Sequence, residues 1–198
     1  MSHKVALIGN GPVSEEQRQE IHSYDTVIRL ARINNYKLDD KMTHLCLDGL
    51  GLRKGNPRYK GLYLDTVVKN KADYMVFIDK NWEFLIQQNK EMGFNGESIH
   101  FGIPNNGWLI KTLQCKHLSL GLKGFLFAQT FGCQIHLFGF NWNSVMKKYG
   151  HNPDKEKEFI LNHENVILHE TPTSELGYVI DEKVTLLTHM SPKESDYC

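Results

Sequence analysis

A chain of 198 residues is long enough for one α/β domain with a full hydrophobic core and too short for two such domains. Lysine and arginine together number 23, as do aspartate and glutamate, so no general positive field would draw the protein onto nucleic acid or an anionic membrane. We therefore expect its partner to be a discrete molecule.

The four cysteines show no C-x-x-C spacing, which argues against a zinc site or a redox pair. No apolar run reaches the ~18 residues of a membrane span, and no charged leader precedes a long apolar stretch. We expect a cytoplasmic protein with reduced thiols, and peripheral attachment to a membrane stays open. The cysteines are Cys46, Cys115, Cys133 and Cys198.

The first part of the chain predicts a strand, a glycine-rich turn and a helix. Residues 5–8 form a short apolar run without polar alternation, which is typical of a strand covered on both faces. Residues 9–12, Gly-Asn-Gly-Pro, cannot continue this strand, because the glycines favour a turn and proline lacks a backbone donor. Ser14, with Gln17 three residues later, predicts a capping box that opens a helix over residues 15–22.

A turn of this kind leaves the backbone N–H groups around Gly9, Asn10 and Gly11 beside the positive end of a helix dipole, where a phosphate can be held. The segment is not the dinucleotide fingerprint, which would require a glycine in place of Ser14, and it is not a Walker loop. An ordinary strand-to-helix turn is an equally good interpretation of these residues by themselves.

Strand and helix patterns alternate along the rest of the chain. This alternation predicts a single Rossmann-like α/β domain over residues 1–170, with a mainly parallel sheet and helices on both faces. An irregular tail is expected over residues 171–198. Further strands are predicted at 26–30, 43–47, 72–78, 98–101, 134–138 and 166–168, helices at 82–92, 122–131 and 154–162, and a turn at 104–107.

The second informative stretch is an apolar helix, opened by Ser119 and Gly121, and the strand that follows it. That strand ends at Gly139, Phe140 and Asn141. Ligands of open α/β sheets bind outside the carboxyl ends of the strands, so we expect this turn and the turn at residues 9–12 to face one crevice. Core or rim packing is the alternative interpretation of Phe140.

Three segments, in this order, resemble the motifs of sialyltransferases. KVALIGNGP and DTVIRL, in residues 4–30, look like the long motif that binds the donor nucleotide. LSLGLKGFLFAQTFGCQIHLFGF, residues 118–140, resembles the short motif, and YGHNPDKEKEFI, residues 149–160, is similar to a downstream element with a histidine and a glutamate, here His151 and Glu156. The segments span most of residues 4–168.

This resemblance implies a variant of the GT-A-like fold and an enzyme that transfers sialic acid from CMP-sialic acid to a glycan hydroxyl, with inversion at the anomeric carbon. CMP-sialic acid would be a substrate, and no cofactor or metal is expected. The sequence agrees with the last point, because it contains no Asp-x-Asp triplet that would anchor a metal ion under a nucleoside diphosphate sugar.

The resemblance also implies which residues bind the donor. Asn10 would contact its phosphate or ribose, the start of the apolar helix would hold the phosphate and the sugar carboxylate, and the turn after residues 134–138 would frame the cytidine. The donor-binding residues so implied are Gly9, Asn10, Gly11, Asn34, Ser119, Leu120, Gly121, Gly139, Phe140 and Asn141.

His151 would be the catalytic base. A sugar hydroxyl is a poor nucleophile at neutral pH, and an imidazole is well matched to accept its proton. His151 lies between Gly150 and Asn152-Pro153, which predicts a turn just before a helix rather than a core position. The hydroxyl of Tyr149 is a candidate for stabilising the leaving CMP.

Three positions depart from the family pattern. Ala31 stands where members usually carry an asparagine, so that contact either comes from Asn34 or Asn35 or is missing. Leu120 replaces a serine or threonine at the start of the helix. Val5 stands near the position of a cysteine that Golgi members join to the short motif, a loss that agrees with a reducing compartment.

Two other functions stay open at this point. The losses at Ala31 and Leu120 concern the donor's sugar, so a related CMP-activated acidic sugar such as Kdo is an alternative donor. The second alternative is a catalytically inactive nucleotide-binding module that serves interaction.

Overall fold

The computed structural model describes residues 3–30, 40–47, 72–78, 82–91, 94–142 and 144–171. Asn34, Asn35 and all but the first residue of the expected tail lie outside this part of the chain. The elements, in order, are β1 (Lys4–Ile8), α1 (Glu15–His22), β2 (Thr26–Leu30), β3 (His44–Leu47), β4 (Tyr74–Phe77), α3 (Trp82–Glu91), β5 (Glu97–His100), α4 (Asn106–Thr112), α5 (Leu120–Gln129), β6 (Gln134–Phe138), the 3-10 helix η1 (Ser144–Tyr149), α6 (Pro153–Leu161) and β7 (Val166–Leu168).

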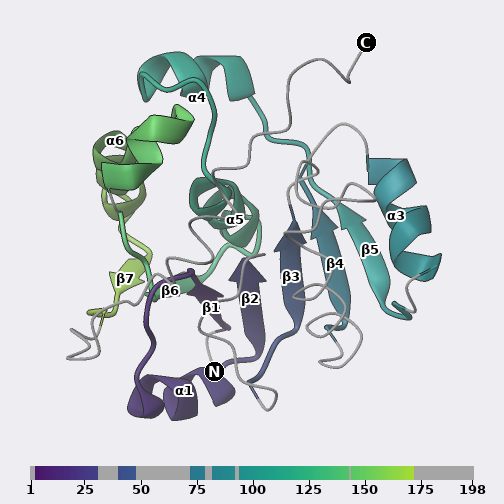
Figure 1. Ribbon diagram of the computed structural model, residues 1–198. Helices are drawn as coiled ribbons and strands as arrows, with labels where there is room; N and C mark the ends of the chain where they lie inside the picture. Colours follow the sequence, from purple (N-terminus) through teal and green to yellow (C-terminus); the bar gives the residue numbers. More distant parts are fainter. Residues whose placement is uncertain are drawn as a thin grey trace, which may run out of the picture.

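The seven strands of the described residues form one parallel sheet in the order β5-β4-β3-β2-β1-β6-β7 (Figure 1). From β1 the chain builds outward to β5 on one side, and then returns to place β6 and β7 on the other. The fold is therefore Rossmann-like α/β, as the sequence predicts. The direction in which the chain adds strands to the sheet reverses between β1 and β6. Open parallel sheets bind ligands at such a switch point.

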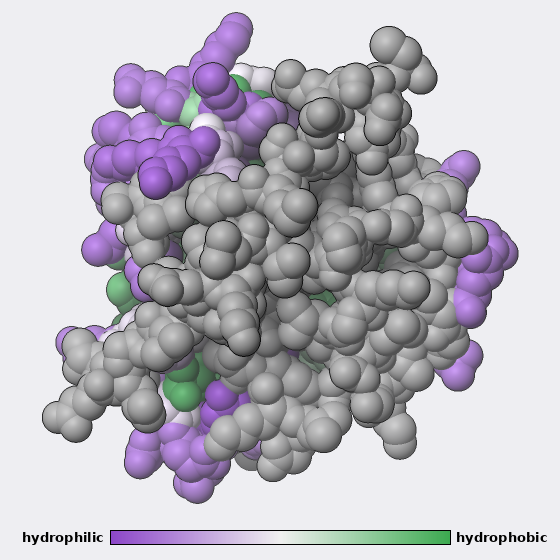
Figure 2. Space-filling model, in the orientation of Figure 1, coloured by the Kyte–Doolittle hydropathy of each residue, from purple (hydrophilic) through white to green (hydrophobic). Residues whose placement is uncertain are grey.

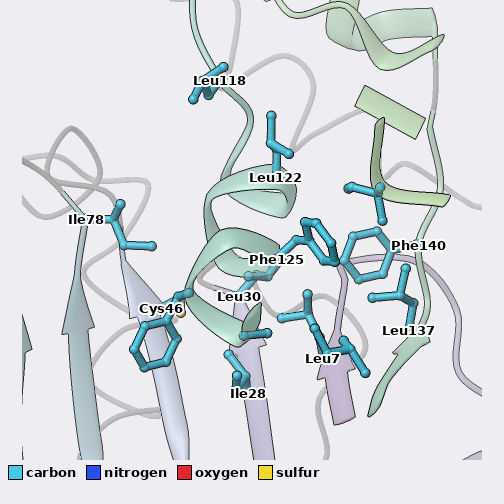
Figure 3. Packing of buried hydrophobic residues seen from close by; sticks show 14 of the residues in the cluster. Leu7, Ile28, Leu30, Cys46, Ile78, Leu118, Leu122, Phe125, Leu137 and Phe140 are labelled. Carbon is cyan, nitrogen blue, oxygen red and sulfur yellow. The ribbon is translucent and has the colours of Figure 1, made fainter. Parts of the chain in front are cut away.

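Helices cover both faces of the sheet, as predicted. Successive residues of a buried strand point to opposite sides, so apolar strands present apolar side chains on both faces of the sheet. Leu7 of β1 points toward α5, where Phe125 is fully buried beside it (Figure 3). Ile8, the next residue, packs with Ile21 of α1 on the other face. Full burial of a side chain of this size contributes about 1.5–3 kcal/mol, so the larger α5 cluster supplies most of the apolar stabilisation.

The capping box predicted at α1 is present. The hydroxyl oxygen of Ser14 accepts a hydrogen bond of 3.2 Å from the Gln17 backbone N–H, and the Gln17 side chain accepts one of 3.0 Å from the Ser14 N–H. The helix buries little besides Arg18 and Ile21, and Figure 2 shows hydrophilic atoms where Figure 1 places its outward side. Because α1 has few apolar contacts, its polar neighbours carry more of its attachment.

The prediction of a turn over residues 104–107 is wrong in part, because α4 begins at Asn106. Asn105 precedes the helix with a positive φ of 54° and makes no side-chain capping hydrogen bond, so the usual sequence signal for a helix start is missing. The 3-10 helix η1 was likewise not predicted.

None of the helices that the structure describes is long and apolar enough to cross a membrane. Three cysteines lie within the described ranges, Cys46, Cys115 and Cys133, and all three are free thiols.

Candidate functional site

Two turns meet at the switch point between β1 and β6, and we call residues 9–11 and 139–141 the turn pair. The Gly9 N–H donates to the Phe138 carbonyl oxygen at 2.8 Å, and the Gly11 N–H donates to the Gly139 oxygen at 2.7 Å. A Cβ atom at Gly9 would lie 2.5 Å from that Gly139 oxygen, and one at Gly11 would lie 2.7 Å from it. The close approach of the two backbones therefore requires glycine at both positions.

Because these two N–H groups already donate within the protein, a ligand at the turn pair must be held by other groups. Asn10 is half-buried and Asn141 is exposed, so both offer a polar side chain at this edge. Phe140 is buried, and its ring lies 5.4 Å from that of Trp142, which matches the packing interpretation. The turn pair thus consists mainly of backbone contacts.

A second group of residues lies where α6 meets the start of α5, and we call residues 116–121 and 150–156 the helix junction. The hydroxyl oxygen of Ser119 caps α5 by accepting a 3.1 Å hydrogen bond from the Leu122 N–H. The same hydroxyl donates to Glu156 Oε2 at 2.5 Å, and the Ser119 N–H donates to Glu156 Oε1 at 3.0 Å. A carboxylate from α6 therefore occupies the positive end of α5, where it is electrostatically favoured.

Glu156 is only 1% exposed. Burial raises the pKa of its carboxyl, while the two hydrogen bonds from Ser119 and the charges of His151 and Lys123 act in the opposite direction. The sequence assigned Ser119 to the donor, but any ligand contact through this residue must be shared with Glu156. Glu156 itself was missed as a site residue, although it stands in the third motif five residues after His151.

His151 is held by the loop that leads into α5. Its Nδ1 atom lies 2.8 Å from the carbonyl oxygen of His117, and the Gly150 oxygen accepts a 2.7 Å hydrogen bond from the Lys116 N–H. A carbonyl oxygen can only accept, so the neutral ring carries its proton on Nδ1 and has its lone pair on Nε2. Nε2 makes no hydrogen bond to any described residue, and this nitrogen is available to take up a proton.

The turn pair and the helix junction are neighbours. A Cβ atom at Gly121 would lie 3.5 Å from the ring of Phe140, so the first turn of α5 borders the turn after β6. Leu120 is half-buried in the same helical turn. Tyr149 is 58% exposed at the end of η1, two residues before His151, and its role in catalysis stays a prediction.

The structure therefore defines an α/β protein of Rossmann-like fold in which the glycine turn contacts the turn after β6, and that turn borders the start of α5. His151 contacts the loop that leads into α5. Comparisons with protein-family models, curated proteins and solved structures gave no match for this chain. The donor-binding assignments remain predictions, and those at Asn34 concern a residue outside the described ranges.

Proposed function

We propose that this protein is a metal-independent glycosyltransferase that moves sialic acid from CMP-sialic acid to a glycan hydroxyl. The observation that carries the proposal is the 2.8 Å contact between Nδ1 of His151 and the carbonyl oxygen of His117, because it leaves Nε2 of the neutral ring as a proton acceptor. The order of the three resembling segments supports the same conclusion.

In the proposed reaction, Nε2 of His151 takes the proton of the acceptor hydroxyl while that oxygen attacks the anomeric carbon of sialic acid. The bond from this carbon to the phosphate oxygen breaks, and CMP leaves with the electron pair. Attack from the face opposite CMP inverts the configuration. The imidazolium that forms is stabilised by the buried carboxylate of Glu156, with which His151 interacts electrostatically.

The donor would lie along the turn pair and the first turn of α5. Asn10 and Asn141 are the polar side chains of the turn pair that can reach it, since Gly9 and Gly11 already donate their N–H groups to the turn after β6. Gly121 allows the donor to approach the helix backbone closely, because this residue has no side chain. The exposed hydroxyl of Tyr149 would then help to stabilise the leaving phosphate.

The decisive experiment supplies the protein with CMP-sialic acid, a lactose-type acceptor and excess EDTA, and measures both CMP and sialylated product. His151→Ala should lower the rate by about a hundredfold or more and leave the affinity for CMP nearly unchanged. The matched control is His22→Ala, which removes an exposed imidazole from the end of α1 and should retain full activity. Full activity of His151→Ala would exclude this histidine as the base.

A related donor is the second candidate, because Leu120 places an apolar side chain where the family has a hydroxyl for the sugar carboxylate. Turnover with another CMP-activated acidic sugar such as Kdo, and none with CMP-sialic acid, would favour it. CMP binding without any turnover would instead indicate an inactive nucleotide-binding module.

A further inference from the structure

A cluster of three possible metal ligands lies on the α1 face of the sheet. Glu20 comes from α1, His136 from β6 and His169 from the segment just after β7, and each offers one ligand atom within 4.8 Å of the others. Nδ1 of His136 and Nε2 of His169 are 2.9 Å apart. The cluster belongs to neither the turn pair nor the helix junction.

The outer nitrogens of both rings face oxygen acceptors. Nε2 of His136 is 3.1 Å from Oε1 of Gln134, and Nδ1 of His169 is 3.7 Å from a carboxylate oxygen of Glu20. The Gln134 oxygen favours a proton on Nε2 of His136 and so a lone pair on its Nδ1. The 2.9 Å between the inner nitrogens then fits a hydrogen bond from Nε2–H of His169, and a metal ion that binds both inner nitrogens takes the place of this proton, which moves to Nδ1 of His169 beside Glu20.

Neighbouring aromatic side chains hold this arrangement in place. The ring of His169 stacks on Phe138 with centroids 3.9 Å apart, and Tyr24 meets the ring of His136 edge-on at 5.0 Å. The Tyr24 hydroxyl also donates to Glu20 at 2.9 Å. His136 is only 7% exposed. Because the rings and the carboxylate are oriented by their surroundings, little further ordering is required for a metal ion to bind.

We propose that Glu20, His136 and His169 bind one divalent transition-metal ion, for which zinc is the best match. Two imidazoles and a carboxylate are donors that zinc prefers, whereas magnesium and calcium prefer a shell of oxygen ligands. A tetrahedral zinc ion holds its nitrogen ligands about 3.3 Å apart, so the two rings need to separate by a few tenths of an ångström. They also need to turn, because the inner nitrogens point at each other, with the ring centroids 5.2 Å apart. Water or an external ligand takes the fourth position.

A bound ion would cross-link parts of the chain that are distant in sequence. Glu20 and His169 are brought together from α1 and from the end of the described chain, where the Gln17 side chain also donates to the Glu170 carbonyl at 2.8 Å. An ion bound only by the folded state stabilises it by mass action. This inference is independent of the proposed transferase, since zinc binding requires neither donor nor acceptor.

The test titrates the metal-free full-length chain with zinc at neutral pH by calorimetry, and with cobalt(II) to record the absorption bands of a tetrahedral site. We expect one equivalent to bind and the melting temperature to rise. His169→Gln should weaken zinc binding by about a hundredfold or more, and Glu20→Gln by about tenfold or more. Both residues are partly exposed, so these variants should fold.

The matched control is His22→Gln, which removes an exposed imidazole two residues from Glu20 on the same helix and should bind zinc like the unchanged protein. Failure of the unchanged protein to bind zinc would overturn the proposal and leave the contact between the two rings as a hydrogen bond. Zinc binding of equal affinity in His169→Gln would overturn it too, because the ion would then lie elsewhere.

Discussion

The turn pair and the helix junction border each other but are built differently. The turn pair depends on backbone: two N–H groups donate to two carbonyl oxygens, and the Gly9 and Gly11 positions have no room for a Cβ atom. The helix junction depends on side chains, with Ser119, Glu156 and His151 linked by hydrogen bonds and charge. Glycine in the first motif is thus explained by packing alone, whereas the polar residues of the second region are not.

The difference matters for function because a buried carboxylate is unfavourable unless it is well paired. Glu156 is almost fully buried, and each of its two carboxylate oxygens accepts a hydrogen bond from Ser119. Apolar packing does not require a charge at this position. The helix junction is therefore the better place to look for chemistry, and the turn pair the better place to look for stability.

The largest expected effect is on stability at the turn pair. Gly9→Ala places a methyl group 2.5 Å from the Gly139 carbonyl oxygen, and both backbones are held by the strands that end one residue before them. We expect the free energy of unfolding to fall by about 3 kcal/mol in chemical denaturation. Gly102→Ala is the control, since a Cβ there meets no atom within 4 Å, and it should change stability by less than about 0.5 kcal/mol. Equal stability of the two variants would show that the turns do not pack this closely.

The next prediction compares the stability lost when each of two helix caps is removed. Ser119→Ala removes the cap of α5 and one of the two hydrogen bonds to buried Glu156, so unfolding should become easier by about 2 kcal/mol. Ser14→Ala removes the more exposed cap of α1 and should lower stability by about 1 kcal/mol. Denaturation curves of both variants measure the difference. A larger loss at Ser14 would contradict the central role assigned to the Glu156 contact.

Glu156→Gln should change how the stability of the protein depends on pH. Burial raises the pKa of Glu156 in the folded protein, so the unfolded chain releases this proton at lower pH than the folded chain does. The stability of the unchanged protein therefore falls as pH rises from the unfolded to the folded pKa. Glutamine does not titrate, so the stability of the variant relative to the unchanged protein should rise as the pH increases above the ordinary pKa of a glutamate carboxyl, as denaturation curves at several pH values would measure.

The control for this titration is Glu158→Gln on the same helix. Glu158 is exposed and forms a surface ion pair with Lys155 at 2.9 Å, which contributes little to stability. Its stability difference from the unchanged protein should stay within about 0.5 kcal/mol at every pH. If the stability difference between Glu156→Gln and the unchanged protein also does not vary with pH, folding does not raise the pKa of the Glu156 carboxyl.

The sequence predicted those parts of the fold that local signals determine. The bounds of α1, β2, β6 and β7 agree with the prediction, because capping residues, glycines and short apolar runs mark their ends. β4 is shorter than the strand expected over residues 72–78, because residues 72, 73 and 78 lie outside it. Residues 72 and 78 are buried like strand residues, so their apolar character does not mark the ends of β4. The whole of α4 was missed, because Asn105 supplies no capping hydrogen bond that a pattern can anticipate.

The contacts of the candidate site were harder to predict, because they join residues that are distant in sequence. Ser119 and Glu156 are 37 positions apart, and no local pattern shows that Glu156 of α6 accepts hydrogen bonds at the start of α5. The three residues of the metal cluster come from three separate elements, so a search for closely spaced cysteines and histidines does not find them. The sequence indicated which turns lie at the switch point, but the hydrogen bonds that occupy their N–H groups required coordinates.

The smallest effect on stability, and the sharpest contrast with Gly9, is expected at Gly121. A methyl group there would meet the Phe140 ring and the Ser119 hydroxyl at 3.5 Å, which is ordinary contact, and alanine favours a helix more than glycine does. Gly121→Ala should therefore unfold within about 0.5 kcal/mol of the unchanged protein. If the donor lies against the first turn of α5, the same methyl group should weaken CMP binding by about tenfold, measured by calorimetry. Unchanged CMP affinity would place the nucleotide away from the helix junction and leave His151 without a substrate.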